Sequence, residues 1–323
     1  MRRWVVAAAV VASACGGGGG GATSLSAFCA SLNAALAGAA VKCLHASATY
    51  LAAEHQESLG PDCGDLQKAA NAGRLTFNSA SAKACLDAVS SCAVFDPQRA
   101  VPAPCLVALG GTVGVGGTCF QDTDCQAGSF CDTATACPGA CVAYAALGGD
   151  CTSTPCDPSL ACDNGTGKCV AQAAAGAACA NADPQCQAGL YCDPSGSTPI
   201  CAAQKTSGAC STGLDQCATG YACTGTGSST CQSLIGLGGD CSTAPELCGL
   251  GFECGADGKC ASLPTIPNAC SVGQLCVGGY CDSTGHCAAW KKKGDPCSTD
   301  QAAQCVTGIC DGSRCVSDTC SPP

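Results

Sequence analysis

Cysteine is the residue type in this sequence with the widest chemical range, because thiolates bind metals and attack electrophiles while paired thiols form disulfides. The chain has 37 cysteines among 323 residues, above the roughly 8 to 10% at which cysteine content alone indicates a disulfide scaffold. Aromatic residues contribute 4% and charged residues 12%. This composition predicts an exported protein in an oxidising compartment, where disulfides stand in for a large core. It excludes an ordinary cytosolic globular enzyme.

The spacing of the cysteines argues against a metal site. Structural zinc usually takes ligand pairs two to four residues apart, whereas the chain has no C-x-x-C or C-x-C and its closest pair is Cys137 and Cys141. We therefore interpret the cysteines as disulfide partners and assign no metal. A calcium site formed by Asp122, Asp124 and Asp132 is the strongest alternative, although these carboxylates lack a loop of fixed register.

Residues that commonly carry catalysis do not form a site. His45 and His55 are expected on the surface of a helix and His286 in a turn, and none belongs to an H-E-x-x-H motif. The glycine-rich segment 110–118 lacks the Lys-Ser or Lys-Thr that completes a phosphate-binding loop, so we predict a hinge there. No catalytic or cofactor-binding residue is assigned, and the chain is predicted not to be an enzyme.

The N-terminus resembles an export signal. In residues 1–14 two arginines precede an apolar stretch that ends in small residues before Cys15, the order found in secretory signals. Ala12-Ser13-Ala14-Cys15 resembles the lipobox of bacterial lipoproteins, which implies that Cys15 receives a diacylglyceryl group. Residues 15–23, with six consecutive glycines, then form a flexible tether. Cleavage by the A-x-A rule is the alternative, and it would release a secreted soluble protein.

Residues 24–109 are rich in alanine and predict a small helical domain stapled by disulfides. The first helix is capped by Ser24 or Ser26 and extends to about Tyr50 or His55. Further helices are expected from Asp62 to Gly73, over about 79–93 and over about 104–109. The six cysteines of this domain are Cys29, Cys43, Cys63, Cys85, Cys92 and Cys105.

Two of these cysteines constrain the packing of the helices. Cys85 and Cys92 lie two turns apart on one face of the third helix, so each should bond to another helix rather than to its neighbour. The connectivity stays open, since six cysteines allow 15 pairings.

From Cys119 the sequence changes to a tandem repeat over residues 119–320, followed by a tail of residues 321–323. First cysteines recur every 27 to 32 residues, which gives seven units of four cysteines; we call them modules 1 to 7 in chain order. Two disulfides per module, each contributing roughly 2 to 4 kcal/mol, must hold a unit too small to fold by burial alone. The module cysteines are Cys119, Cys125, Cys131 and Cys141; Cys151, Cys156, Cys162 and Cys169; Cys179, Cys186, Cys192 and Cys201; Cys210, Cys217, Cys223 and Cys231; Cys241, Cys248, Cys254 and Cys260; Cys270, Cys276, Cys281 and Cys287; and Cys297, Cys305, Cys310 and Cys315.

Two residues recur at fixed places within the modules. A glycine three residues after the second cysteine is expected where a turn needs positive φ or close backbone approach. One bulky apolar residue before the third cysteine is expected to be the hydrophobic centre of each module. Turn residues then predict a short β-hairpin that the fourth cysteine closes. The glycines are Gly128, Gly189, Gly220, Gly251, Gly279 and Gly308, and the apolar residues are Phe130, Leu160, Tyr191, Tyr221, Phe252, Tyr280 and Ile309.

The predicted fold class is therefore a tandem array of small disulfide-rich modules, mostly loop with short β-hairpins, behind a small α-helical domain. We expect an elongated array in which each module contacts only its neighbours. Cys137 and Cys320 are left over from the pattern. They either bond to each other and close the array end to end, or Cys320 is free for an intermolecular bond; we expect Cys137 to be satisfied locally.

The spacing C-x(5)-C-x-x-G-x-x-C of module 1, and its close variant in module 3, resembles the opening of the Dickkopf N-terminal cysteine-rich domain, and more distantly EGF-like modules. The whole chain is similar to a class of cysteine-rich lipoproteins of GC-rich Gram-negative bacteria. The modules have fewer cysteines than a Dickkopf domain and lack the C-x-C of EGF modules. The resemblance thus implies an extracellular disulfide module and transfers no receptor-binding residue.

Together these features predict a non-enzymatic lipoprotein of the outer membrane or cell surface that binds a protein or surface polymer, with loop residues such as Gln121, Asp122 and Gln301 at the contact. A passive spacer of the envelope is the alternative function, and a periplasmic or secreted protein the alternative location. The net charge of −10 disfavours binding to nucleic acid. The only basic run, residues 291–293, is expected to be a solvated linker.

Overall fold

The computed structural model describes residues 24–53, 62–96, 101–134, 136–179, 186–211, 216–225, 229–271, 274–292, 294–297, 304–305, 310 and 312–315. The predicted signal, Cys15 and the tether lie outside these residues, as do His55, Gln301, Gly308, Ile309 and Cys320. The described residues confirm the predicted fold class: an N-terminal helical region, here called the head, is followed by many short antiparallel hairpins stapled by disulfides.

Helix α1 (Leu25–Leu44) is the central element of the head. The hydroxyl of Ser24 accepts from the backbone N–H of Ala27 and caps its N-terminus. The predicted continuation to Tyr50 is wrong, because His45 adopts a left-handed conformation (φ 49°) that ends the helix. Ser47 then accepts from the N–H of Tyr50 and starts the separate helix α2 (Ala48–Ala53).

Helix α1 is long and apolar enough to cross a membrane by length and composition alone. Half of that stretch is buried inside the head, and disulfides from Cys29 and Cys43 tie the helix to other parts of the head. We therefore interpret α1 as the core helix of a folded domain.

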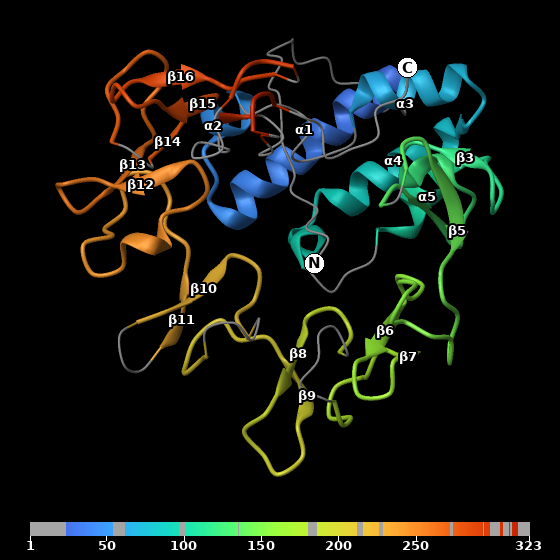
Figure 1. Ribbon diagram of the computed structural model, residues 1–323. Helices are drawn as coiled ribbons and strands as arrows, with labels where there is room; N and C mark the ends of the chain where they lie inside the picture. Colours follow the sequence, from blue (N-terminus) through green and yellow to red (C-terminus); the bar gives the residue numbers. More distant parts are fainter. Residues whose placement is uncertain are drawn as a thin grey trace.

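The other elements of the head pack on α1 (Figure 1). The side chains of Asp62 and Asn78 cap the second and third predicted helices. Helix α4 ends earlier than expected, and Cys92 lies in the short 3-10 helix that follows. The elements are α3 (Cys63–Asn71), β1 (Leu75–Phe77), α4 (Ser79–Val89), η2 (Cys92–Phe95), α5 (Ala103–Ala108) and β2 (Leu109–Gly111).

Apolar side chains and disulfides hold the head together. Phe28 and Leu32 of α1 pack with residues of α4 and α5, and the ring of Phe28 lies 5.3 Å from that of Phe77. Each head cysteine bonds to a different element, as predicted for Cys85 and Cys92. The pairs are Cys29–Cys63, Cys43–Cys92 and Cys85–Cys105.

All seven modules share one connectivity, first cysteine to third and second to fourth. The third and fourth cysteines face each other across the hairpin, as Cys162 and Cys169 do, yet each bonds to a cysteine outside it. The two disulfides therefore fasten both strands of the hairpin to the segment that precedes it.

The module strands and 3-10 turns are β3 (Thr118–Cys119), η3 (Asp122–Asp124), β4 (Ser129–Asp132), β5 (Gly139–Ala143), β6 (Leu160–Asp163), β7 (Lys168–Ala171), β8 (Leu190–Asp193), β9 (Ile200–Ala203), β10 (Tyr221–Thr224), β11 (Thr230–Ser233), η4 (Pro245–Leu247), β12 (Phe252–Cys254), β13 (Cys260–Ser262), β14 (Leu275–Cys276), β15 (Gly279–Cys281) and β16 (Cys287–Ala289).

The joins between modules belong to the module fold. In module 2, Gly148 N–H donates to the carbonyl of Cys169 (2.8 Å) and the N–H of Cys169 donates to Gly149 (2.9 Å). Ala145 forms a parallel bridge with Cys156. Equivalent bonds recur in other modules, which explains why each join, the segment from the fourth cysteine of one module to the first cysteine of the next, has eight or nine residues.

The glycine-rich segment 110–118 is a hydrogen-bonded junction in the structure and not the hinge that its composition predicts. Gly111 pairs with Leu75 in the two-stranded sheet of the head. Thr112 donates from its N–H to Arg74 and from its hydroxyl to Gly73. Val113 bridges Cys125 of module 1, so the segment bonds to the head at one end and to the first module at the other.

The expected elongated array is contradicted by contacts between the modules and the head. In Figure 1 the hairpins follow an arc beside the helices, from β3–β5 (green) near α4 and α5 to β14–β16 (orange-red) near α2. Module 3 donates from Gly189 N–H to the carboxylate of Asp96, and the N–H of Ser47 donates to Leu250 in module 5 (2.7 Å). The array therefore wraps around part of its own chain.

The recurring turn glycine forms this contact in successive modules. A Cβ added at Gly220 would overlap the carbonyl oxygen of Cys43, and one added at Gly251 would overlap Tyr50. In module 6 the positive φ falls on Gly278 rather than on the predicted Gly279, and Gly278 lies against Ala53. The turn glycines thus provide both positive φ and close backbone approach to the head.

A pair of glycine substitutions tests this docking. Gly128→Ala and Gly220→Ala place a side chain at nearly the same positive φ (82° and 85°), which costs roughly 1–2 kcal/mol in either variant. Only Gly220→Ala also overlaps the head, so it should lower the free energy of unfolding by a further ~1–3 kcal/mol. Denaturant unfolding with the disulfides intact measures the difference. Equal losses would show that the turn of module 4 does not dock.

Candidate functional site

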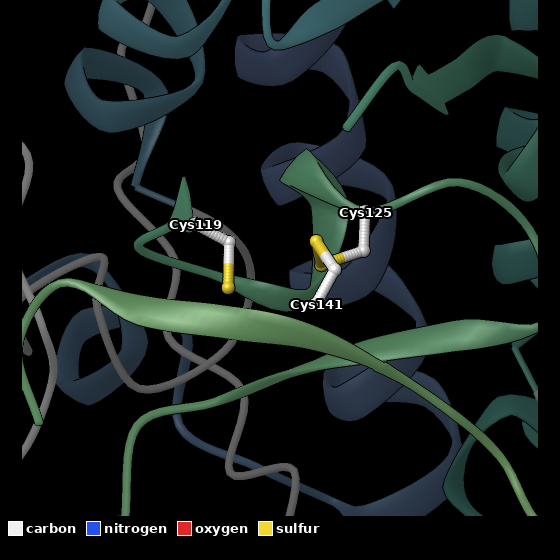
Figure 2. Close-up of side chains that lie close together, drawn as sticks. All are labelled: Cys119, Cys125 and Cys141. Carbon is white, nitrogen blue, oxygen red and sulfur yellow. A yellow bond between two sulfur atoms is a disulfide. The ribbon is translucent and has the colours of Figure 1, made fainter. Parts of the chain in front are cut away.

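The sulfur atoms of each module gather into a compact group. In module 1 the Sγ atoms of Cys119, Cys125 and Cys141 lie within 4.8 Å of one another (Figure 2). Similar triplets occur in modules 2 to 5. All of these sulfurs belong to disulfides, whereas zinc takes deprotonated thiolates. Metal ligation at these groups would first require both disulfides to be reduced.

The disulfide group is the hydrophobic centre of the module, in place of the single apolar residue that the sequence predicted. The four cysteines of module 1 form a buried cluster with Val113 against it. The predicted apolar residue is buried at Phe130 and Tyr191 and half-buried at Leu160, Tyr221, Phe252 and Tyr280. The rings of Phe130, Tyr191 and Tyr280 pack against the following join, as Phe130 does on Tyr144 (5.1 Å between centroids).

The acidic residues considered for calcium each take part in a different protein contact. Asp124 is fully buried and its Oδ2 lies 3.2 Å from Nε of Arg74 in the head. The same oxygen accepts from the N–H of Phe120 (2.9 Å), whose ring lies under the Arg74 guanidinium. Asp122 accepts from the N–H of Cys131 and Asp132 from that of Ala134. These carboxylates fix module 1 and its contact with the head.

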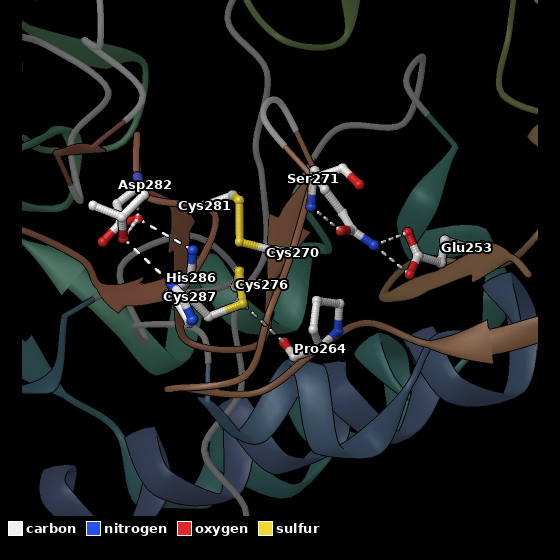
Figure 3. The surroundings of a disulfide bond; sticks show 11 residues. Glu253, Pro264, Cys270, Ser271, Cys276, Cys281, Asp282, His286 and Cys287 are labelled. Atoms are coloured by element: carbon white, nitrogen blue, oxygen red, sulfur yellow. Dashed lines mark hydrogen bonds between the residues drawn. A yellow bond between two sulfur atoms is a disulfide. The ribbon is translucent and has the colours of Figure 1, made fainter.

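Exposed aspartates stabilise the tight turns of the modules. In module 6 the carboxylate of Asp282 accepts from the Thr284 hydroxyl (2.7 Å) and from the N–H groups of Thr284 and His286 (Figure 3). The hydroxyl bond is the largest cause that lowers the pKa of Asp282. Hydroxyl donors likewise lower the pKa of Asp150, Asp163 and Asp240.

The direction of these pKa shifts determines how the stability of the turns depends on pH. A carboxylate with a lowered pKa in the folded state contributes stability above its unfolded pKa, and this contribution is lost as the pH falls through the folded pKa. The turns should therefore hold at neutral pH and loosen in strong acid.

Other residues singled out in the sequence have structural contacts. His286 lies in the hairpin turn of module 6, as predicted, while His45 is the exposed residue that ends α1. Lys291 of the basic run donates to the buried side chain of Gln304 and bridges Cys305, so this residue belongs to the join before module 7 rather than to a free linker. Gln121 contacts Asp124.

Sequence reasoning missed the residue immediately before the second cysteine. It is buried at Asp124, Gln216, Leu247 and Gln304. In module 4 the side chain of Gln216 accepts from the N–H of Ser211, which follows the first cysteine. The recurrence of glutamine before a second cysteine, at 185, 216 and 304, was the available signal.

Before modules 1, 2 and 5 a large apolar side chain faces solvent at the same position of the turn, where modules 3 and 4 are preceded by Ala175 and Ser207. Val115, Leu147 and Leu237 are 68%, 68% and 66% exposed, and each precedes a positive-φ glycine. A hydrogen bond such as Gly149 N–H to Ala146 carbonyl closes each turn, so the apolar residue occupies the second position of a type II turn. Single exposed apolar residues are common on surfaces, but recurrence on rigid turns makes these side chains the candidate binding surface.

No protein-family model matches the chain, and no similar protein was found among curated sequences or solved structures. The chain is a cysteine-rich protein with many disulfides, and their number indicates an oxidising, exported or extracellular environment.

The contact between Arg74 and Asp124 can be tested against an exposed ion pair. Arg74→Met leaves the buried carboxylate of Asp124 without its charged partner and should cost about 3 kcal/mol of stability. Lys83→Met breaks the Lys83–Asp87 pair, whose side chains are 67% and 65% exposed, and should cost no more than about 0.5 kcal/mol. Denaturant unfolding compares the two variants. A small, equal effect would contradict a structural role for the buried pair.

Proposed function

We propose that the protein is a non-enzymatic lipoprotein of the cell envelope, anchored through Cys15, that binds a protein or surface polymer through exposed apolar residues on the turns that precede its modules. The observation that carries the proposal is the repeated exposed apolar residue on a rigid turn, at Val115, Leu147 and Leu237. Such turns are already fixed before binding, which lowers the entropy lost on association.

The position of the head narrows the surface that is open to a partner. The turn glycines of modules 4, 5 and 6 lie against the head, so this side of the modules is already covered. The side chains of Gln121 and Asp122, which the sequence places in exposed loops, form hydrogen bonds within module 1. They are therefore less available to a partner. Val115, Leu147 and Leu237 keep their side chains exposed. These residues, rather than the loops, are therefore the proposed contact.

The anchor and the location remain part of this proposal. Lipidation rests on the lipobox resemblance around Cys15, and the outer membrane or cell surface is the location that follows from it. The resemblance to the Dickkopf N-terminal domain supports an extracellular disulfide module and implies nothing about signalling. A secreted soluble protein, or a passive structural component of the envelope, is the alternative.

Substitution of the join residues separates a binding protein from a passive component. Crosslinking at the surface of the native cells captures a partner, and Leu147→Ser with Leu237→Ser should reduce that capture about tenfold or more, because each leucine loses roughly 1 kcal/mol of apolar burial. The matched control is Leu106→Ser with Val107→Ser, two residues of α5 that are 57% and 56% exposed.

The control pair should leave capture unchanged. Equal capture by the wild type and both double variants would contradict binding through the joins. Absence of any specific crosslinked partner would favour the passive component.

A further inference from the structure

One cysteine in the described part of the chain has a bond that the module pattern does not explain. Cys137 is disulfide-bonded. Every other described cysteine is bonded to another described cysteine, in the head pairs and in the two pairs of each module. The expectation that Cys137 is satisfied locally is therefore wrong, because no cysteine of module 1 is available to it.

Elimination leaves two candidates for the partner. The remaining cysteines of the sequence are Cys15 and Cys320, both outside the described residues. Cys137 is exposed and lies in the hairpin loop between β4 and β5. A side chain at that place is accessible to a segment from elsewhere in the chain.

We infer that Cys137 bonds to Cys320 of the same chain and that this disulfide closes the module array into a covalent ring beside the head. Cys320 is five residues beyond Cys315, the last cysteine of module 7, so the spare cysteines mark the two ends of one array. The choice of Cys320 over Cys15 rests on the proposed lipidation of Cys15, which would occupy that thiol.

The wrapped path of the modules makes closure reasonable. Module 1 contacts the head at Arg74, next to the strand that packs with the N-terminal end of α1. Module 5 contacts Ser47, beyond the C-terminal end of α1, and module 6 contacts Ala53. The array thus contacts the head near both ends of α1, a helix of 20 residues that spans about 30 Å. The modules therefore stay beside this helix along their path.

Formation of the bond needs no chemistry beyond that of the other disulfides. The thiols of Cys137 and Cys320 give up two protons and two electrons to an external protein or small-molecule disulfide, which becomes two thiols. A mixed disulfide on one cysteine is attacked by the thiolate of the other, and the new Sγ–Sγ bond replaces the external one.

Disulfide mapping of the mature protein tests the inference. The protein is purified from its native cells without reductant, free thiols are alkylated, and digestion at acidic pH prevents exchange before mass spectrometry. We expect a crosslinked peptide pair that joins Cys137 to Cys320, in protein that migrates as a monomer on a non-reducing gel. A Cys137–Cys15 peptide, or a Cys137–Cys320 bond confined to covalent dimers, would overturn the ring.

The same digest reports the anchor separately. An acylated N-terminal Cys15 together with a dimeric Cys137–Cys320 bond would leave the lipoprotein standing and remove the ring. An unmodified Cys15 together with the monomeric bond would do the reverse.

Matched variants give a second readout that does not require peptide recovery. Under denaturing, non-reducing conditions Cys320→Ser should expose one additional maleimide-reactive thiol per chain, at Cys137. Cys15→Ser should expose none. The opposite pattern would assign the bond to Cys15 and overturn the inference.

Discussion

Close approach of the turn glycines of modules 4 to 6 to the head determines the path of the module array. Gly220 and Gly251 have no Cβ, and a Cβ at either place would overlap the head. In modules 4, 5 and 6 the turn glycine lies against the head, so one local conformation provides a docking point in three successive modules. The modules consequently lie around part of the head, while Val115, Leu147 and Leu237 keep exposed side chains on their turns.

Disulfides make such small modules possible. A unit of about thirty residues cannot bury enough apolar surface to fold alone, and the cluster at the centre of module 1 consists of its four cysteines. Bonds from first to third and from second to fourth cysteine fasten both hairpin strands to the preceding segment. Aspartate side chains such as Asp282 then fix the turns, and the module needs little further core.

Local features of the sequence predicted much of the local structure, although not where the first helix ends. Asp62 begins its helix as expected, and Gly128, Gly189, Gly220 and Gly251 take the predicted positive φ. The docking of modules on the head could not be predicted, because the need for positive φ is by itself enough to account for a glycine at these positions. Nothing in the sequence indicates that some of these glycines also lie against the head. The ion pair of Asp124 with Arg74 could not be predicted either, because the two residues are 50 positions apart in the sequence.

Small-angle X-ray scattering of the mature protein tests most directly whether the modules wrap around the head. A compact chain of roughly 300 residues has a radius of gyration of about 19 Å. We predict a value near this, with a single-peaked distribution of interatomic distances. A clearly larger radius with a long tail in that distribution would contradict the wrapped arrangement and restore an extended stalk.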